Sequence, residues 1–218
     1  WYTYSILINN VNKKIYINYI YILKIYKKFW FKSSKTRLNA GLLKIILDCL
    51  NSIQSGVKVI IVENSNNFLH KEKVNLRFPN TEIYCTGNNL GYGGGNNFGL
   101  QKVTSDYALI LNPDIICDEN LFKNISAVID ETKDFSIIGC QYLYDKIFMP
   151  AGFFDQTKNN EFKLNFHNNN LNNLTEVEWV TGCSMLLNLR KFESNKIFDE
   201  NFFLYFEEID LCKSLIKK

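Results

Sequence analysis

The length, composition and charge of the chain exclude several classes of protein. Its 218 residues suffice for one α/β domain with its own core and are too few for two. With 46% apolar and 15% aromatic residues the chain is not a disordered protein. A formal net charge of +3 is too small to indicate a nucleic-acid-binding protein, so we expect no nucleic-acid partner.

The cysteines and histidines argue against disulfides and structural zinc. No CxxC pair occurs among the six scattered cysteines, several of which lie in apolar runs, so we expect buried free thiols in a reducing compartment. The two histidines, His70 and His167, are far apart and have no cysteine partners in the pattern of a zinc site.

The first 31 residues form an atypical segment, and we assign residues 32–218 to a single catalytic domain. The apolar run at 15–23 is too short to cross a bilayer and is closely flanked by lysines. Its β-branched and aromatic residues favour one or two strands, which would include the first strand of a sheet. Binding to a membrane surface is the alternative, because aromatic and lysine side chains suit that interface.

Helices and strands alternate through the first half of the domain. Apolar residues recur at helical spacing over 42–53, and Gly56 follows as a stop. Residues 57–62 (VKVIIV) predict a buried strand that runs into the polar turn Glu63-Asn64. The pattern continues with a short strand at 82–85, a glycine-rich loop at 88–97 and a helix at 98–103.

The second half repeats the alternation with one interruption. Residues 107–111 form a continuous apolar run, typical of a central parallel strand, and end at Asn112-Pro113-Asp114. Next come a helix at 121–132, a strand at 136–140, an Asn-rich surface excursion at 149–178, an ordered segment at 177–187 and an amphipathic helix at 209–216. The alternation predicts an α/β domain with a mostly parallel central sheet flanked by helices and a ligand site at the strands' carboxyl ends.

Three local motifs have both a chemical and a structural interpretation. The glycine-rich loop would let backbone N–H groups approach a phosphate, or it is only a tight turn. Asp114 suits a hard divalent cation bound to a diphosphate, or it is an ordinary turn residue. The acidic cluster Glu207, Glu208 and Asp210 would begin a helix, where negative charge is stabilised. One of its carboxylates, partly desolvated by the aromatic residues before it (Phe203, Tyr205 and Phe206), would also serve as a general base.

The order of the motifs is more specific than any one of them. An acidic turn after an early strand is followed by NLGYGGGNNFG, LNPD, WVTGCSML and FDENFFLYFEEIDLC. This series resembles the family 2 glycosyltransferases with the GT-A fold, especially their rhamnosyltransferase-like branch, over residues 42–218. The resemblance implies a GT-A (nucleotide-diphospho-sugar transferase) fold.

The resemblance also implies roles for individual residues. Glu208 aligns with the catalytic base of inverting members, with Glu207 beside it. Asp114 stands where the family's DxD-type motif ends and would bind the diphosphate through Mg²⁺ or Mn²⁺. The other implied donor-binding residues are Glu63, Asn64, Gly91, Gly95 and Asn96, and the implied acceptor-binding residues are Trp179, Thr181 and Gly182.

The implied function is transfer of a sugar from a nucleotide-diphosphate donor, such as dTDP-rhamnose, to a hydroxyl of a glycan or lipid-linked acceptor. We expect a role in the synthesis of a cell-surface polysaccharide, in the cytoplasm or peripherally at the inner face of the membrane. The first alternative is a non-catalytic relic that binds nucleotide without turnover. A sugar nucleotidylyltransferase ranks third, because no basic glycine-rich loop follows the first strand.

Three features depart from the family pattern, and the atypical N-terminus and the missing C-terminal region support the relic. Only Lys32-Ser33 of the segment Trp30-Phe31-Lys32-Ser33 fits the family's first nucleotide-contacting turn. Glu63 replaces the usual aspartate that reads the nucleobase. The sequence also stops where family members continue, so we expect a catalytic domain truncated at its C-terminus.

Overall fold

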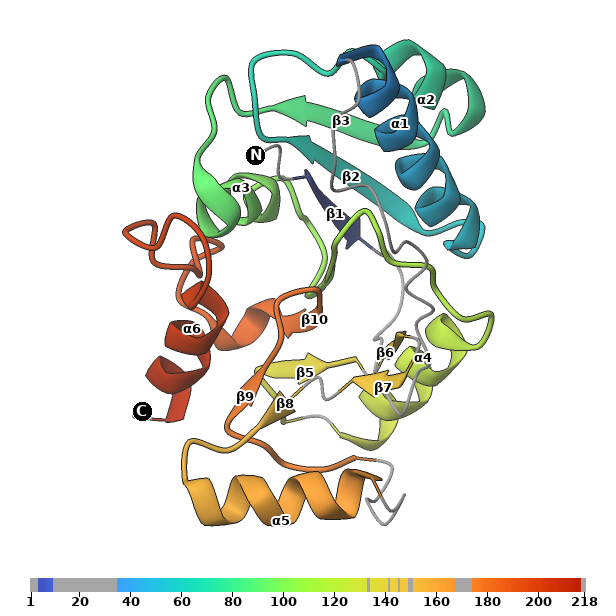
Figure 1. The fold of residues 1–218 in the computed structure, drawn as a ribbon. Coiled ribbons are helices and arrows are strands. Elements are labelled where there is room, and N and C mark those ends of the chain that lie inside the picture. The colour runs from blue at the N-terminus through green and yellow to red at the C-terminus, as the bar shows by residue number, and fades with distance from the viewer. Residues whose placement is uncertain are drawn as a thin grey trace.

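The computed structural model describes residues 4–9, 35–132, 134–140, 142–144, 146–148, 151–167 and 174–216. Within these ranges helices and strands alternate along the chain, as expected (Figure 1). The helices are α1 (Lys35–Ser52), α2 (Lys71–Arg77), α3 (Gly91–Leu100), α4 (Leu121–Glu131), α5 (Gln156–His167) and α6 (Glu207–Ile216). The strands are β1 (Tyr4–Asn9), β2 (Lys58–Glu63), β3 (Thr81–Cys85), β4 (Tyr107–Leu111), β5 (Ile137–Gly139), β6 (Tyr142–Tyr144), β7 (Lys146–Phe148), β8 (Ala151–Gly152), β9 (Trp179–Val180) and β10 (Ser184–Asn188).

Six of these strands form the central sheet, in the order β3-β2-β1-β4-β10-β5. Only the β2–β3 pair is parallel, and the other four pairs are antiparallel. The prediction of a mostly parallel sheet is therefore wrong at the level of pairing. Strands β2, β3, β4 and β5 do share one direction. Strand β1 lies between β2 and β4, strand β10 lies between β4 and β5, and both run in the opposite direction. A buried apolar run predicts that a strand is covered on both faces and carries no information on its direction.

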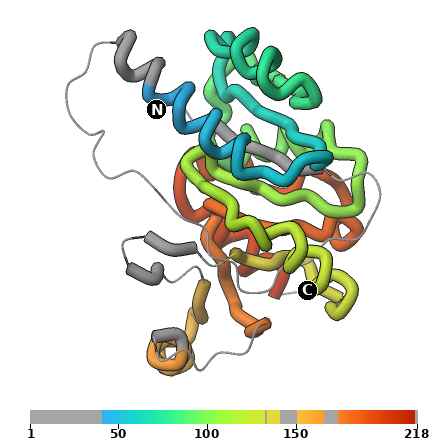
Figure 2. Tube along the Cα trace, turned by 90° about the vertical axis from the view of Figure 1, so that its right-hand side faces the viewer, coloured from blue at the N-terminus to red at the C-terminus, as the bar shows by residue number. Residues whose placement is uncertain are grey.

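The sheet lies between two layers of helices, because alternate residues of each strand face opposite sides. In β2, Ile61 packs with α1 and α4, whereas Ile60 packs with α3 and α6. Leu109 and Ile110 of β4 divide between the same two clusters. Figure 1 shows α1 and α2 on one side of β2 and β3 and α3 on the other. Helix α5 lies apart from the sheet, at the end of the molecule away from α2 (Figures 1 and 2).

One prediction about local structure is wrong, and a second is incomplete. The glycine-rich segment predicted as a loop is helical from Gly91 onward, and nine of the ten residues of α3 are buried. The predicted surface excursion at 149–178 contains β8 and α5, and most of the described side chains of α5 are exposed, as the prediction requires. The helix shows little periodicity, and its Phe162 is buried in the cluster that includes Ile60 and Leu211. Packing against neighbouring elements decides the structure of α3, and packing is not visible in local propensity.

Other expectations have plainer outcomes. Helices α1, α4 and α6 and the strands at 57–62, 82–85, 107–111 and 136–140 form where the patterns predict them, within a few residues. All six cysteines are free thiols, and Cys49, Cys117, Cys140 and Cys212 are buried. The strands expected at 15–23 lie outside the described residues. In the described part of the chain no helix combines the length and apolarity needed to cross a membrane.

Candidate active site

Four loops converge at the edge of the sheet where β2 and β4 end. The N–H of Thr86, after β3, donates to the carbonyl of Glu63 at the end of β2 (3.0 Å). The N–H of Asn112, after β4, donates to the carbonyl of Cys183 just before β10 (3.0 Å). The pairing of Ser184 with Leu111 brings the start of β10 to the end of β4. The segments 63–65, 86–91, 112–114 and 181–183 therefore share the edge at which parallel strands bind ligands.

Asn64 holds the start of α3 against the end of β2. Its buried side-chain amide donates to the carbonyl of Gly91 (2.7 Å) and to Oδ1 of Asn89 (3.2 Å). Its Oδ1 accepts from the N–H of Leu90 (2.9 Å) and from the hydroxyl of Thr86 (3.2 Å). Because these bonds are internal to the protein, the side chain of Asn64 fixes the conformation of the loop at 86–91.

The glycines of α3 allow close packing on both of its sides. A Cβ added to Gly91, whose φ is +76°, would lie 2.1 Å from the carbonyl oxygen of Phe203. A Cβ on Gly95 would lie 3.1 Å from Nδ2 of Asn64, and one on Gly93 would lie 3.0 Å from Cβ of Phe198. Helix α3 thus packs tightly between the end of β2 and the segment that leads to α6.

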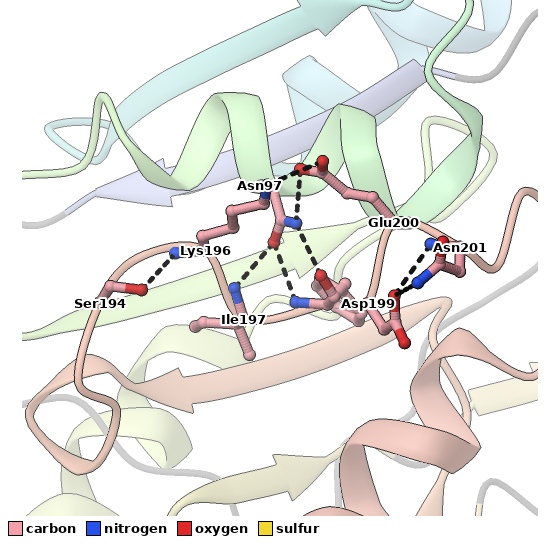
Figure 3. A network of polar contacts seen from close by, with 8 residues as sticks. Asn97, Ser194, Lys196, Ile197, Asp199, Glu200 and Asn201 are labelled. Atoms are coloured by element: carbon pink, nitrogen blue, oxygen red, sulfur yellow. Dashed lines mark hydrogen bonds and ion pairs between the residues drawn. The ribbon is translucent and has the colours of Figure 1, made fainter.

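Asn97 fastens that segment to α3 (Figure 3). Its Oδ1 accepts from the N–H groups of Ile197 (2.8 Å) and Phe198 (2.9 Å). Its Nδ2 donates to the carbonyl of Phe198 (2.8 Å) and to Oε1 of Glu200 (3.1 Å). The buried amide makes bonds in both directions, as a buried polar group must to be stable. Sequence reasoning missed Asn97, because only its partners about 100 residues away reveal its role.

Tyr92 interacts with the predicted acceptor loop and with both predicted catalytic glutamates. Its hydroxyl donates to the carbonyl of Gly182, in the predicted acceptor loop. Burial raises the pKa of Tyr92 well above its usual range, and the nearby charges of Cys183, Glu208 and Glu207 raise it further. The phenol therefore stays protonated beside the two carboxyl groups. Tyr92 was not among the predicted site residues, although it lies inside the glycine-rich motif.

The two predicted catalytic carboxylates begin α6, beside α3 and β9. Glu207 is only 4% exposed, and a Cβ added to Gly93 of α3 would lie 3.6 Å from its Cβ. Burial and, less strongly, the charge of Glu208 raise the pKa of Glu207. Oε2 of each glutamate is buried without a hydrogen-bond partner among the described residues. These are carboxylates with unused acceptor capacity, as a general base requires.

The predicted cause of this desolvation is wrong. Phe203, Tyr205 and Phe206 were expected to cover a carboxylate, but they are 56%, 66% and 67% exposed. Glu207 instead packs against α3, where Gly93 has no side chain and leaves room for it. The aromatic residues adjoin the acidic pair in sequence and remain open to solvent.

The other predicted residues occupy varied positions. Asn96 is buried in α3, and its amide donates to the carbonyl of Tyr92 (3.1 Å). Oγ1 of Thr181, in the β9–β10 turn, lies 3.2 Å from Sγ of Cys183. Trp179 packs over Gly152 of β8. None of the eleven predicted site residues lines the hollow of about 560 Å³ between 196–201 and α6.

Asp114 is the residue that the metal prediction depends on. It is half-buried in the turn after β4, and its charge contributes to the raised pKa of Cys49 on α1. The described residues bring no three His, Cys, Asp or Glu side chains together as a metal cage. A Mg²⁺ or Mn²⁺ ion that takes most of its ligands from substrate phosphates and water needs only one or two carboxylates. Asp114 fits that more limited role.

The loop-lined edge at β2 and β4, with a carboxylate pair at the start of α6, suits an enzyme that binds a nucleotide-sugar. The model of glycosyl transferase family 2 matches residues 38–196, so the chain belongs to this family and is a glycosyltransferase. The family implies the GT-A fold. The match includes Glu63, Asp114 and Gly182 and ends before α6, so the roles of Glu207 and Glu208 depend on the motif and the geometry.

Two curated proteins are similar to the chain. The rhamnosyltransferase WbbL of Escherichia coli (strain K12) is 27% identical over 197 residues, which cover 79% of this chain and 71% of WbbL. The low-salt glycan biosynthesis hexosyltransferase Agl10 of Haloferax volcanii is 28% identical over 135 residues, which cover 58% of this chain and 43% of Agl10. The chain therefore matches less than half the length of the second relative.

Proposed function

We propose that the chain is an inverting glycosyltransferase in which Glu208 is the general base. The observation that carries the proposal is the position of the Glu207–Glu208 pair. Each has a buried Oε2 with no hydrogen-bond partner in the part of the chain that the structure describes. Their charges affect Tyr92, whose hydroxyl donates to the carbonyl of Gly182 in the predicted acceptor loop. A carboxylate there would reach an acceptor hydroxyl held between α3 and the β9–β10 turn.

The two glutamates have different roles in this proposal. Glu208 is partly exposed although its Oε2 is buried, so an acceptor hydroxyl would approach its other carboxylate oxygen, whereas Glu207 is almost fully buried. Glu208 accepts the proton of the acceptor hydroxyl, whose oxygen attacks the anomeric carbon of the donor from the face opposite the nucleotide. The glycosidic bond to the diphosphate breaks, and the nucleoside diphosphate leaves with the bonding electrons. Glu207 holds the start of α6 against α3 and thereby positions Glu208.

The donor would bind along the edge formed by β2, β4 and the start of α3. The backbone around Gly91, Gly95 and Asn96 would adjoin the diphosphate, and the Glu63-Asn64 turn would adjoin the base. Asp114 would hold a Mg²⁺ or Mn²⁺ ion, which when bound supplies positive charge to the leaving diphosphate. Positioned charge of this kind is the largest contribution to many group transfers.

The donor sugar and the acceptor are proposed more narrowly from the resemblance. The name of WbbL supports a rhamnosyl donor such as dTDP-rhamnose, and the name of Agl10 supports glycan synthesis with another hexose. We propose a glycan or lipid-linked acceptor of a cell-surface polysaccharide, bound by Trp179, Thr181 and Gly182. A lipid-linked acceptor would bring the enzyme to the inner face of the membrane.

Calorimetric titration of the purified chain with UDP and dTDP, each with and without Mn²⁺, tests the donor site. We expect metal-dependent binding that Asp114→Ala abolishes. Asp118→Ala is the matched control, because this nearby acid caps the following turn through the N–H of Asn120 (2.8 Å). Failure of the folded protein to bind either nucleotide, or unchanged binding by Asp114→Ala, would overturn the donor-site assignment.

One observation favours the alternative of a nucleotide-binding relic without turnover. Glu63 stands where the family has the base-reading aspartate and is only 1% exposed, so its carboxylate is not presented to a ligand. The relic predicts nucleotide binding with no release of sugar from any donor. A turnover assay on a protein that binds nucleotide therefore separates the two candidates.

A further inference from the structure

The aromatic residues before α6 are poorly suited to a purely structural role. Tyr205 and Phe206 both have positive φ angles, +68° and +70°, which bulky L-residues rarely adopt. Their side chains are 66% and 67% exposed, so burial of the rings does not offset the backbone strain. Glycine or asparagine would fit this backbone better.

Phe206 is also an unfavourable residue for the start of a helix. Its carbonyl accepts the N–H of Asp210 (2.8 Å), which makes it the residue that caps α6. Helix caps favour Ser, Thr, Asp or Asn, whose side-chain oxygens accept the free N–H groups of the first turn, and a phenyl ring cannot do this. Strained residues that also weaken a helix start indicate a function at that place.

The position of Tyr205 and Phe206, next to the predicted catalytic glutamates in sequence, indicates a role in ligand binding. Tyr205 and Phe206 directly precede the two glutamates, and the preceding Phe203 accepts the N–H of Tyr92 through its carbonyl (3.0 Å). The exposed rings therefore lie next in sequence to carboxylates whose Oε2 atoms have no hydrogen-bond partner among the described residues. A pyranose ring matches both features, since its C–H groups form an apolar face and its hydroxyls are hydrogen-bond donors. Binding sites for such ligands combine aromatic side chains with a few convergent polar groups.

We propose that Tyr205 and Phe206 form a stacking platform for a pyranose ring of the acceptor. The rings hold the apolar face of the sugar, and its hydroxyl lies at Glu208. This inference depends on the proposed function for the identity of the base, but the platform binds sugar whether or not nucleotide is bound. It adds two acceptor-binding residues to those expected in the β9–β10 turn.

Saturation-transfer NMR with the methyl pyranosides of glucose, galactose, mannose, N-acetylglucosamine and rhamnose tests the platform. We expect at least one of them to receive saturation on its ring C–H protons. Tyr205→Asn and Phe206→Asn keep a residue that tolerates the backbone and remove one ring each, and each should weaken binding roughly two- to tenfold. Phe154→Ala, at a 44% exposed aromatic residue before α5, should leave binding unchanged.

Two further measurements on the same variants make the result decisive. The melting temperature should not fall in Tyr205→Asn or Phe206→Asn, because the strain is relieved; a clear fall would assign the rings to the fold and overturn the proposal. Co-sedimentation with phosphatidylglycerol vesicles should not depend on the two rings. The platform is refuted if no pyranoside binds the wild type, if the variants bind equally well, or if the rings are needed only for vesicles. Nucleotide titration of the same samples reports separately on the proposed function.

Discussion

The contact between Gly91 and Phe203 yields the sharpest prediction of stability, through the variant Gly91→Ala. Residue 91 has a φ of +76°, and the new Cβ would lie 2.1 Å from the carbonyl oxygen of Phe203 and 2.9 Å from its carbonyl carbon. Atoms this close cannot coexist, and both obstacles belong to the backbone. The substitution must therefore separate the start of α3 from the segment before α6.

Three costs add to the expected magnitude. Left-handed backbone for alanine costs about 1–2 kcal/mol. Displacement of Phe203 breaks the 3.0 Å hydrogen bond from Tyr92 N–H to its carbonyl, which is worth about 1 kcal/mol. Overpacking of a tight contact adds about 1–3 kcal/mol. The free energy of unfolding should fall by roughly 3–6 kcal/mol, a large part of the stability of a typical domain.

Gly56→Ala is the matched control for backbone strain. Gly56 has a φ of +85°, and nothing lies within 4 Å of the position of its added Cβ. The free energy of unfolding of Gly56→Ala should fall only by the roughly 1–2 kcal/mol that a positive φ costs alanine. The effect of alanine on the entropy of the unfolded chain is the same at positions 56 and 91. Urea unfolding followed by circular dichroism measures the two values. Equal losses in the two variants would show that the close approach of α3 to Phe203 is not a feature of the folded protein.

Three other predictions concern polar and ionisable groups. Asn97→Asp replaces an amide that donates to Glu200 by a second carboxylate, so the free energy of unfolding should fall by about 2–4 kcal/mol in urea titrations; an unchanged midpoint would contradict the network. Burial raises the pKa of Glu207 in the folded protein above its unfolded value of about 4.3. The contribution of Glu207 to the free energy of unfolding is therefore complete below about pH 4.3 and is lost as the pH rises through the folded pKa. The gain in melting temperature of Glu207→Gln over wild type should therefore grow from about pH 4 to pH 8, and a shrinking gain would refute this. Cys85 is exposed, whereas burial raises the pKa of Cys117 to about 11, so a thiol reagent should label Cys85 first and Cys117 only on unfolding, as peptide mass spectrometry would report.

The fold was predictable where one pattern dominated. Strand β4 is a continuous apolar run that is buried along its whole length, and α4 has one clear apolar face. The direction of β1 and β10 was not predictable, because direction depends on which strands pair. The glycines of α3 disfavour a helix by about 1 kcal/mol each in isolation, and their tertiary contacts override this preference.

The candidate site was only partly predictable. The order of motifs led to the predictions for Asp114, Gly182 and Glu208, and the first two fall within the residues that the family model matches. Tyr92 and Asn97 were missed because their roles arise from contacts with partners 90 and about 100 residues away. The exposure of Phe206 was also unexpected, since a run of aromatic residues ordinarily predicts burial.

The central claim is that Glu208 is the base of a sugar transfer. The most direct measurement is the release of nucleoside diphosphate from UDP- and dTDP-sugars, in the presence of glycan and lipid-linked acceptors, by wild type and Glu208→Gln. We expect acceptor-dependent release by the wild type and a rate at least about 100-fold lower in Glu208→Gln, with nucleotide binding retained. A Glu208→Gln protein that turns over at the wild-type rate, or a wild type that binds nucleotide and releases none, would contradict the account.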